Sequence, residues 1–416
     1  EVAIMKTLNK LAMVTAIMLP ELLPLVMSKT IERTMKHGLT PYSPAAFALQ
    51  GLVIGFFLGD TKAGVALGET AISLLQLTGS KQDAGQTKLV MYASIWHWRN
   101  PIEEIEQPLI EGYQGGMAAG EVDPAMWCIV SYVEACLVTG RPLPALDEEL
   151  STQSKVMEDF RQHTQIRYTK IIWQAIQNLR GMSDHCVKLV GDAFNEETAT
   201  AKQGSEIERV TLQGRVYYTL YNAPIFGEFQ IGADIIVDKL HDCVKDATGV
   251  ALYPIRIFFG AYCCYITLSQ TLHGKGDSNG SGSGTSIGNR KHKASAYRKT
   301  AKVCKQMLKK WIQGGNPNLT HCLSMLNAEK CVLKRKYDNA VGHYRAAIDF
   351  TRKRGFIHME GLATERLAYC LLVQGEREDA SALHEASIRL FSDWGADKKV
   401  EVMESRWQRA IERGGR

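Results

Sequence analysis

The sequence predicts an all-α protein, an α-solenoid of stacked antiparallel helical hairpins. Two helix-forming segments near the C-terminus, residues 336–356 and 376–396, repeat at an offset of 40 residues. Helical periodicity with glycine or proline stops recurs along the whole chain, whereas strand signals are weak. An earlier pair of glycines, Gly79 and Gly120, has a similar offset of 41 residues. These three observations indicate one degenerate repeat that begins early in the chain.

The C-terminal repeat has the residues that packed helical hairpins need. Small residues lie inside each helix, an aliphatic residue follows, and a glycine stands at the expected stop. A period of about 34–47 residues is typical of tetratricopeptide and related helical repeats. The identical pairs are Ala340/Ala380, Ala346/Ala386, Ile348/Ile388 and Gly355/Gly395.

The first part of the chain, residues 1–272, is predicted to form degenerate helical-hairpin repeats. Pro20 breaks the first hairpin, and Pro101 suits the first turn of a later helix, where a missing N–H costs little. In order, we expect helices at 3–18, 20–37, 44–58, 61–78, 83–99, 101–119, 123–140, 147–180, 183–202, 206–221, 228–247 and 253–272.

A Gly/Ser-rich segment at residues 273–294 is predicted to be a flexible surface insertion, because glycine, serine, asparagine and lysine dominate it. Residues 295–416 are predicted to form tetratricopeptide-like hairpins that continue the first stack; a true boundary between two domains is the alternative. Here we expect helices at 295–313, 319–335, 337–354, 358–374, 377–394 and 396–413.

Composition limits the classes of partner. The chain has 45% hydrophobic and 22% charged residues, and its net charge is +5. This mild excess does not favour a DNA-binding protein, whose charge should be larger and clustered. Ten scattered cysteines without a C-x-x-C pair indicate buried free thiols in a reducing compartment.

Two apolar runs, 11–19 and 46–59, are too short to cross a bilayer, which takes about 20 residues. We therefore expect no transmembrane segment and a cytoplasmic location.

No catalytic residue or cofactor is expected in this segment. The run GSGSGTS at 280–286 lacks the G-K-[ST] ending of a phosphate-binding loop, and kinase, G-x-S-x-G and H-E-x-x-H motifs are missing from the sequence. His185-Cys186, His241 with Cys243, and Cys263-Cys264 lack the paired spacing of zinc sites. Asp234, Asp238 and His241 share a helical face, which a solvated surface explains more simply than a catalytic site.

Residues 290–310 are strongly basic and contain no acidic residue. The simpler interpretation is a solvated helix face, with Ala301, Cys304, Leu308 and Trp311 on the buried side. The alternative is a docking surface for an acidic partner, an anionic lipid or nucleic acid. The nine cations are Arg290, Lys291, Lys293, Arg298, Lys299, Lys302, Lys305, Lys309 and Lys310.

A second candidate site is the corner SIWHWRNP, which contains Trp96, Trp98 and Arg99. Trp96 and Trp98 do not share a helix face, so one of them is available to contact another hairpin. Packing at the hairpin corner is the simpler role, and stacking on a ligand is the alternative.

Three stretches, residues 29–75, 95–143 and 321–396, resemble the helical region of very large bacterial, fungal and algal signalling kinases. G-[DE] turns, an H-W-[RK]-x-P corner and a G-F helix end recur there in the same order. In that family a kinase-like domain and a predicted AAA-type P-loop ATPase precede the tetratricopeptide-like region, and sensor and histidine-kinase domains follow it. The resemblance implies such a parent protein in two-component signal transduction, and it carries over no catalytic residue.

The expected function is a non-catalytic regulatory scaffold that mediates protein–protein or interdomain contacts in a multi-domain ATPase and sensor kinase. The alternative is a stand-alone helical-repeat module that binds a peptide or ligand. A further alternative is an unrecognised all-α enzyme, which would need convergent polar groups in a cleft.

Overall fold

The computed structural model describes residues 1–245, 250–273 and 287–414, and the regular secondary structure in these ranges is helical. The only pairing of the strand type there is an isolated bridge between Val190 and Asn195. The all-α prediction is therefore confirmed. Of the predicted insertion at 273–294, residues 274–286 lie outside the described residues. The next helix begins at Ile287, eight residues before the predicted 295.

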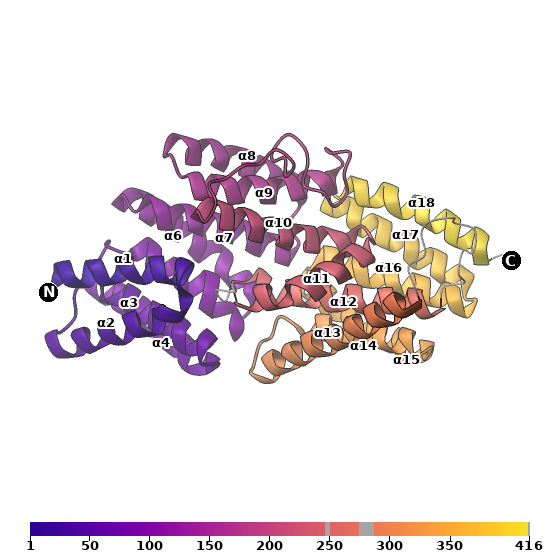
Figure 1. Ribbon diagram of the computed structural model, residues 1–416, viewed down its shortest axis with the longest axis horizontal. Coiled ribbons are helices and arrows are strands. Elements are labelled where there is room, and N and C mark those ends of the chain that lie inside the picture. The colour runs from indigo at the N-terminus through magenta and orange to yellow at the C-terminus, as the bar shows by residue number, and fades with distance from the viewer. Residues whose placement is uncertain (246–249, 274–286, 415–416) are drawn as a thin grey trace.

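The helices follow one another along an elongated molecule whose termini lie at opposite ends (Figure 1). Helices that are neighbours in sequence pack against each other through most of the chain. The α-helices are α1 (Val2–Met18), α2 (Leu23–His37), α3 (Ser43–Leu52), α4 (Thr61–Thr78), α5 (Ala84–Lys88), α6 (Glu106–Ala119), α7 (Val122–Thr139), α8 (Leu143–Asp159), α9 (His163–Arg180), α10 (Glu206–Ile225), α11 (Phe229–Lys245), α12 (Leu252–His273), α13 (Ile287–Gln313), α14 (Thr320–Leu333), α15 (Tyr337–Arg354), α16 (Ile357–Gln374), α17 (Arg377–Trp394) and α18 (Asp397–Gly414).

Five short helical segments of other types join them. Two are π-helical and extend α3 and α5, so the predicted helices at 44–58 and 83–99 each change geometry part-way. They are η1 (Pro20–Leu22), η2 (Val53–Phe57), η3 (Leu89–Ile95), η4 (Trp96–Trp98) and η5 (Ile102–Ile105).

The repeated segment forms two matching helices. α15 and α17 each have 18 residues and end at Gly355 and Gly395, whose φ angles of 71° and 86° place them in the left-handed region. Glycine enters this region without the steric cost that other residues incur. Ala340 and Ala380 are fully buried at equivalent positions. The expected hairpin helices and their glycine stops are therefore present.

The predicted long helix at 147–180 is wrong, because the chain breaks between α8 and α9. Arg161 has a φ of 55°, and this left-handed turn lets α9 pack back against α8. Neither glycine nor proline stands at the break, and arginine seldom adopts this conformation. Burial of Met157 and Ile172 against the rest of the core outweighs the local preference of the backbone.

The predicted helix at 183–202 is also wrong, since residues 181–205 form an irregular connection. Side chains of α9 satisfy its backbone groups. The Asn178 amide donates to the carbonyl oxygen of Lys188 at 2.7 Å, and Gln174 Oε1 accepts from the amides of Ala193 and Phe194 at 3.2 and 3.1 Å. These hydrogen bonds replace those of a helix, so the connection is ordered by its neighbour. We name residues 181–205 the α9–α10 connection.

The core is centred on α12, in which every residue from Leu252 to Leu268 is buried. α12 contacts α7, α10, α11, α13 and α14, so it joins the first half of the chain, which we define as residues 1–273, to the second half, residues 287–414. α7 and α12 are long and apolar enough to cross a membrane, but core helices pass the same test. Their apolar windows are 67% and 94% buried inside the protein.

The ten cysteines also belong largely to this interior. All are free, and eight are buried, as the sequence analysis predicted. Cys186 and Cys331 are partly exposed. Burial raises the pKa of Cys128 and Cys322, which keeps these thiols protonated.

The second half of the chain contacts the first half largely through helix ends. The corner that follows η4 contacts the end of α13, the ends of α15 and α17 contact points further along the first half, and α18 contacts it through Arg406 in the middle of the helix. These contacts link residues about 180–250 positions apart in sequence. The contacting pairs are Arg99 with Gly314, Glu103 with Arg354, Arg141 with Trp394, and Glu228 with Arg406.

Candidate functional site

Trp98 lies inside an aromatic cluster at the junction of the two halves. It is 5% exposed, and its ring centroid lies 5.5 Å from that of Trp311 and 6.1 Å from that of Phe56. Tyr253 of α12 completes the cluster at 5.3 Å from Trp311. Edge-to-face aromatic contacts of this kind stabilise a packed core. The structure therefore places Trp98 in packing between distant helices.

Trp96 and Arg99 lie at the rim of the same junction. The Trp96 ring is partly buried, and its indole N–H donates to Glu104 Oε2 at 3.0 Å. Arg99 is exposed, and its Nη1 donates to the carbonyl oxygen of Gly314 at 2.6 Å. Both side chains thus bind groups of this chain. Trp311 and Gly314 belong to the end of α13 and the turn after it, so the structure brings the two candidate regions together.

Asn318 holds this junction from the side of the second half. Its amide donates to the carbonyl oxygens of His97 and Asn100 at 2.7 and 2.9 Å. Its Oδ1 accepts from the amide of Ile102 at 3.1 Å and from Arg354 Nη2 at 3.0 Å. One side chain therefore satisfies four polar groups in a buried place. The predicted candidate residues did not include Asn318.

The basic helix is anchored at its beginning by an acidic residue of α11. Tyr297 donates to Asp234 Oδ1 at 2.5 Å, and Lys293 Nζ lies 3.4 Å from the same oxygen. Asp238 and His241 are exposed on α11. The side chains of Arg290 and Lys291 lie outside the described residues.

Further along α13, four cations share one face at intervals of four, three and four residues: Arg298, Lys302, Lys305 and Lys309. The predicted buried face is confirmed beside this stripe, where Ala301, Cys304 and Leu308 are fully buried and Trp311 is partly buried. Lys299 and Lys310 are exposed but one position away from this stripe.

Lys330 and Lys334 of the neighbouring α14 segment extend the stripe. Burial, followed by the like charges of Lys330 and Lys309, lowers the pKa of Lys305 to about 8. Within the described residues none of these lysines forms an ion pair, whereas Lys293 does. We name Lys302, Lys305, Lys309, Lys330 and Lys334 the lysine surface.

This arrangement stores electrostatic repulsion, because a positive charge near like charges is unfavourable. A bound carboxylate or phosphate would relieve it. Lys305 Nζ also lies 6.0 Å from the ring centroid of Tyr265, and the aromatic face offers partial compensation. The lysine surface therefore fits an anionic partner.

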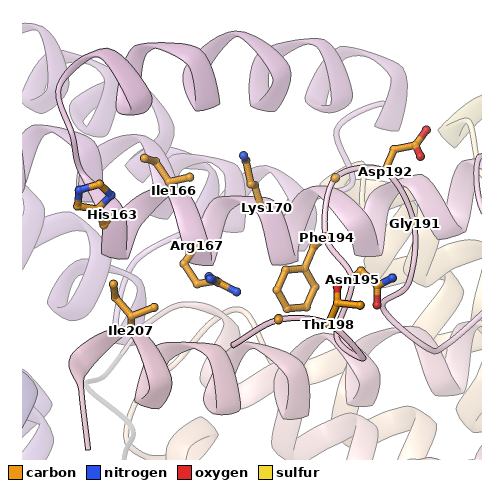
Figure 2. Close-up of a pocket in the computed structure, with 12 residues that line it drawn as sticks. His163, Ile166, Arg167, Lys170, Gly191, Asp192, Phe194, Asn195, Thr198 and Ile207 are labelled. Carbon is orange, nitrogen blue, oxygen red and sulfur yellow. The ribbon is translucent and has the colours of Figure 1, made fainter. Parts of the chain in front are cut away.

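A pocket that the sequence analysis missed lies between α9, the α9–α10 connection and the start of α10 (Figure 2). Its volume is about 450 Å³. His163, Arg167 and Lys170 come from α9 at intervals of four and three residues, and Phe194 and Asn195 come from the connection. The pocket could not be predicted because the sequence pattern predicted a helix at 183–202, where the structure has the irregular α9–α10 connection.

Two buried clusters, each formed by a glutamate, an arginine and at least one tyrosine, were also not predicted from the sequence. Glu134 Oε1 accepts from Tyr168 and Tyr218 at 2.9 and 3.0 Å, with Arg256 Nη2 at 3.4 Å. Burial raises the pKa of both tyrosines, which keeps them protonated as donors. All four side chains are buried, so this cluster has no access for a substrate.

A similar cluster joins α14, α15 and α16. Tyr344 donates to Glu329 Oε1 at 2.6 Å, and Arg366 binds both oxygens of that carboxylate at 2.8 and 3.1 Å. Both clusters are satisfied interior networks. Within the described residues, no three His, Cys, Asp or Glu side chains gather where they could hold a metal ion.

No protein-family model matches the chain, and no curated protein matches it.

Proposed function

We propose that this chain is a non-catalytic helical-repeat scaffold whose lysine surface docks an acidic protein segment. The observation that carries the proposal is the cluster of lysines on α13 and α14, which form no ion pair with the residues that the structure describes, with the pKa of Lys305 lowered by burial and like charge. Carboxylates of a partner would replace this repulsion with attraction, and the interaction would weaken with salt.

The proposal also includes the way in which the helices of the second half are paired. α14–α18 form tetratricopeptide-like hairpins of an α-solenoid, supported by the matched helices α15 and α17 and their glycine stops. In a solenoid each hairpin packs mainly on its neighbours, which leaves extended surfaces for partners. Here the ends of these hairpins also contact the first half, so the lysine surface is held on a stiffened support.

The setting we propose is a cytoplasmic multi-domain signalling kinase. The similarity of three stretches of sequence to the helical region of such kinases supports it, with no independent match. In that setting the acidic segment belongs to a neighbouring domain or a signalling partner, and docking on α13 and α14 biases the position of the attached domains.

The test is the affinity of a fluorescent glutamate-rich peptide, measured by anisotropy at low ionic strength and at about 0.15 M. We expect binding that weakens with salt. Reversing charge at Lys302, Lys305 and Lys309 (K302E, K305E and K309E together) should weaken it about tenfold or more. The matched control reverses three exposed lysines of the first half, Lys36, Lys62 and Lys81, and should leave affinity nearly unchanged.

Equal losses in the two triple variants would mean that only net charge matters and would sink the proposal. Tighter binding of phosphatidylserine vesicles or single-stranded RNA than of the peptide, by the same surface, would also overturn the choice of an acidic protein segment. A stand-alone ligand-binding module remains the second candidate, favoured by the pocket beside α9.

A further inference from the structure

The pocket beside α9 contains one cation that this chain does not neutralise. Lys170 is paired with Glu158 at 2.8 Å, and in Figure 2 its side chain points away from the ring of Phe194. Asp192 is exposed and also points away from the pocket centre. Arg167 points into the pocket, and no carboxylate of the described residues pairs with it. Its Nη2 makes one long hydrogen bond, 3.3 Å to the carbonyl oxygen of Thr200.

The guanidinium of Arg167 is held next to an aromatic surface. Its carbon lies 5.9 Å from the ring centroid of Phe194, which is 6% exposed. Ile166 and Ile207 add apolar surface on the opposite side, and Asn195 adds an amide at the rim (Figure 2). A fork of N–H donors beside apolar walls fits a planar anion attached to a ring.

The connection that carries Phe194 is fixed before any ligand arrives. Gln174 is fully buried, and its Oε1 accepts the amides of Ala193 and Phe194. A Cβ at Gly191 would lie 2.5 Å from Gln174 Nε2, so the backbone passes close to this anchor. Arg215 pairs with Glu196 at 2.9 Å and ties the connection to α10. A preformed site loses little free energy in ordering when it binds.

We infer that this pocket binds a small aromatic anion, a carboxylate or a phosphate monoester, through Arg167 and the face of Phe194. His163 lines the pocket one helical turn before Arg167. The inference does not rest on the lysine surface, which belongs to α13 and α14. It gives the chain a small-molecule site separate from its proposed protein-docking surface.

The experiment uses benzoate and phenyl phosphate as probes and benzyl alcohol as their neutral counterpart. Saturation-transfer NMR titrations of the whole chain should give a dissociation constant of about 1 mM for at least one anion. Benzyl alcohol should bind about tenfold more weakly. The anion that binds more tightly shows whether the pocket prefers a carboxylate or a phosphate. Equal binding of the neutral probe, or no binding of either anion, would overturn the inference.

Arg167→Gln should weaken the preferred probe about tenfold, and Arg167→Lys, which keeps the charge but loses the fork, should weaken it less. Lys188→Gln is the matched control, because Lys188 lies on the same connection in an exposed pair with Glu197 and does not line the pocket. Unchanged affinity in Arg167→Gln would contradict the assignment.

A second measurement needs no variant. Phenylglyoxal modifies accessible arginines, and mass spectrometry locates the modified sites. The preferred anion should slow modification of Arg167 and leave exposed Arg389 unaffected. Protection of both arginines, or of neither, would show that the anion does not occupy this pocket.

Discussion

Single side chains join distant parts of this molecule. Asn318 makes hydrogen bonds to the backbone around His97, Asn100 and Ile102, more than 200 residues earlier in the chain. A local sequence pattern carries no information about such a partner, so Asn318 was expected only as part of a turn between helices. The tryptophans of the same corner could be predicted as candidate residues from their residue type. Asn318 has the local sequence context of an ordinary loop residue, so nothing in the sequence marks it.

Asn318→Ala should lower the free energy of unfolding by about 3 kcal/mol, because it leaves buried carbonyls and an amide without partners. Chemical denaturation of the purified chain measures the change. Asn339→Ala, at an exposed position of α15, is the control and should change stability by less than about 0.5 kcal/mol. Similar losses in the two variants would show that the junction does not depend on Asn318.

Three histidines of the second half are buried against aromatic rings. His321 stacks on Phe350 at 5.4 Å, and His384 stacks on Trp407 at 4.1 Å between centroids. Burial lowers the pKa of His321 to about 3 and that of His384 to about 4. His358, which stacks on Trp394, has a pKa lowered by burial to about 3. These rings are neutral in the folded protein at pH values where the unfolded chain is already protonated.

The protein should therefore lose stability as the pH falls below about 6.5, because the unfolded state gains protons that the folded state does not bind. Each of these histidines should contribute a loss of about 2 kcal/mol by pH 5. Denaturation between pH 7 and pH 5 measures the slope.

His384→Phe keeps a ring on Trp407 and should make this pH dependence shallower. His241→Phe, at an exposed site on α11, should leave the slope as it is. An unchanged slope in His384→Phe would contradict a buried neutral histidine at this position.

At the scale of elements, α3 and α4 approach closely through glycines. A Cβ at Gly64 would lie 2.6 Å from Gly55 Cα and 2.7 Å from the carbonyl oxygen of Gly51. The blocking atoms are backbone, which cannot turn aside as a flexible side chain can. The glycines of this hairpin therefore set the distance between its two helices.

Gly64→Ala should destabilise the protein by about 3 kcal/mol, because one methyl group forces the helices apart. Gly115→Ala in α6 is the matched control, since a Cβ there meets no atom within 4 Å. That change should stabilise the helix by about 0.5–1 kcal/mol. Thermal unfolding compares the variants, and a neutral Gly64→Ala would show that the two backbones do not need this approach.

Elements could be predicted where a local signal marks their ends. Gly355 and Gly395 stopped α15 and α17 at the expected places, and the buried face of α13 followed its apolar spacing. The break at Arg161 and the irregular connection after α9 could not be predicted in this way. Tertiary packing imposes the first, and the side chains of Gln174 and Asn178 stabilise the second. The pocket was missed for the same reason.

At the scale of the whole molecule, the helices of the second half contact the first half at several points along it. α12 joins the two halves, and the ends of α13, α15 and α17 and the middle of α18 contact the first half in succession. In Figure 1 the first helices and the last helices lie at opposite ends of the molecule. A partner bound to α13 therefore acts on a helix that contacts the first half at two points, through Trp311 against Trp98 and through Tyr297 against Asp234.

The most direct test of the proposed docking function is hydrogen–deuterium exchange of the whole chain with and without the glutamate-rich peptide. The account predicts slower exchange in α13 around Lys302–Lys309 and at the end of α14 around Lys330, and unchanged exchange in α9 and the α9–α10 connection. Protection confined to other helices, or no protection at α13 and α14 under conditions where the peptide is bound, would contradict the claim that the lysine surface is its docking site.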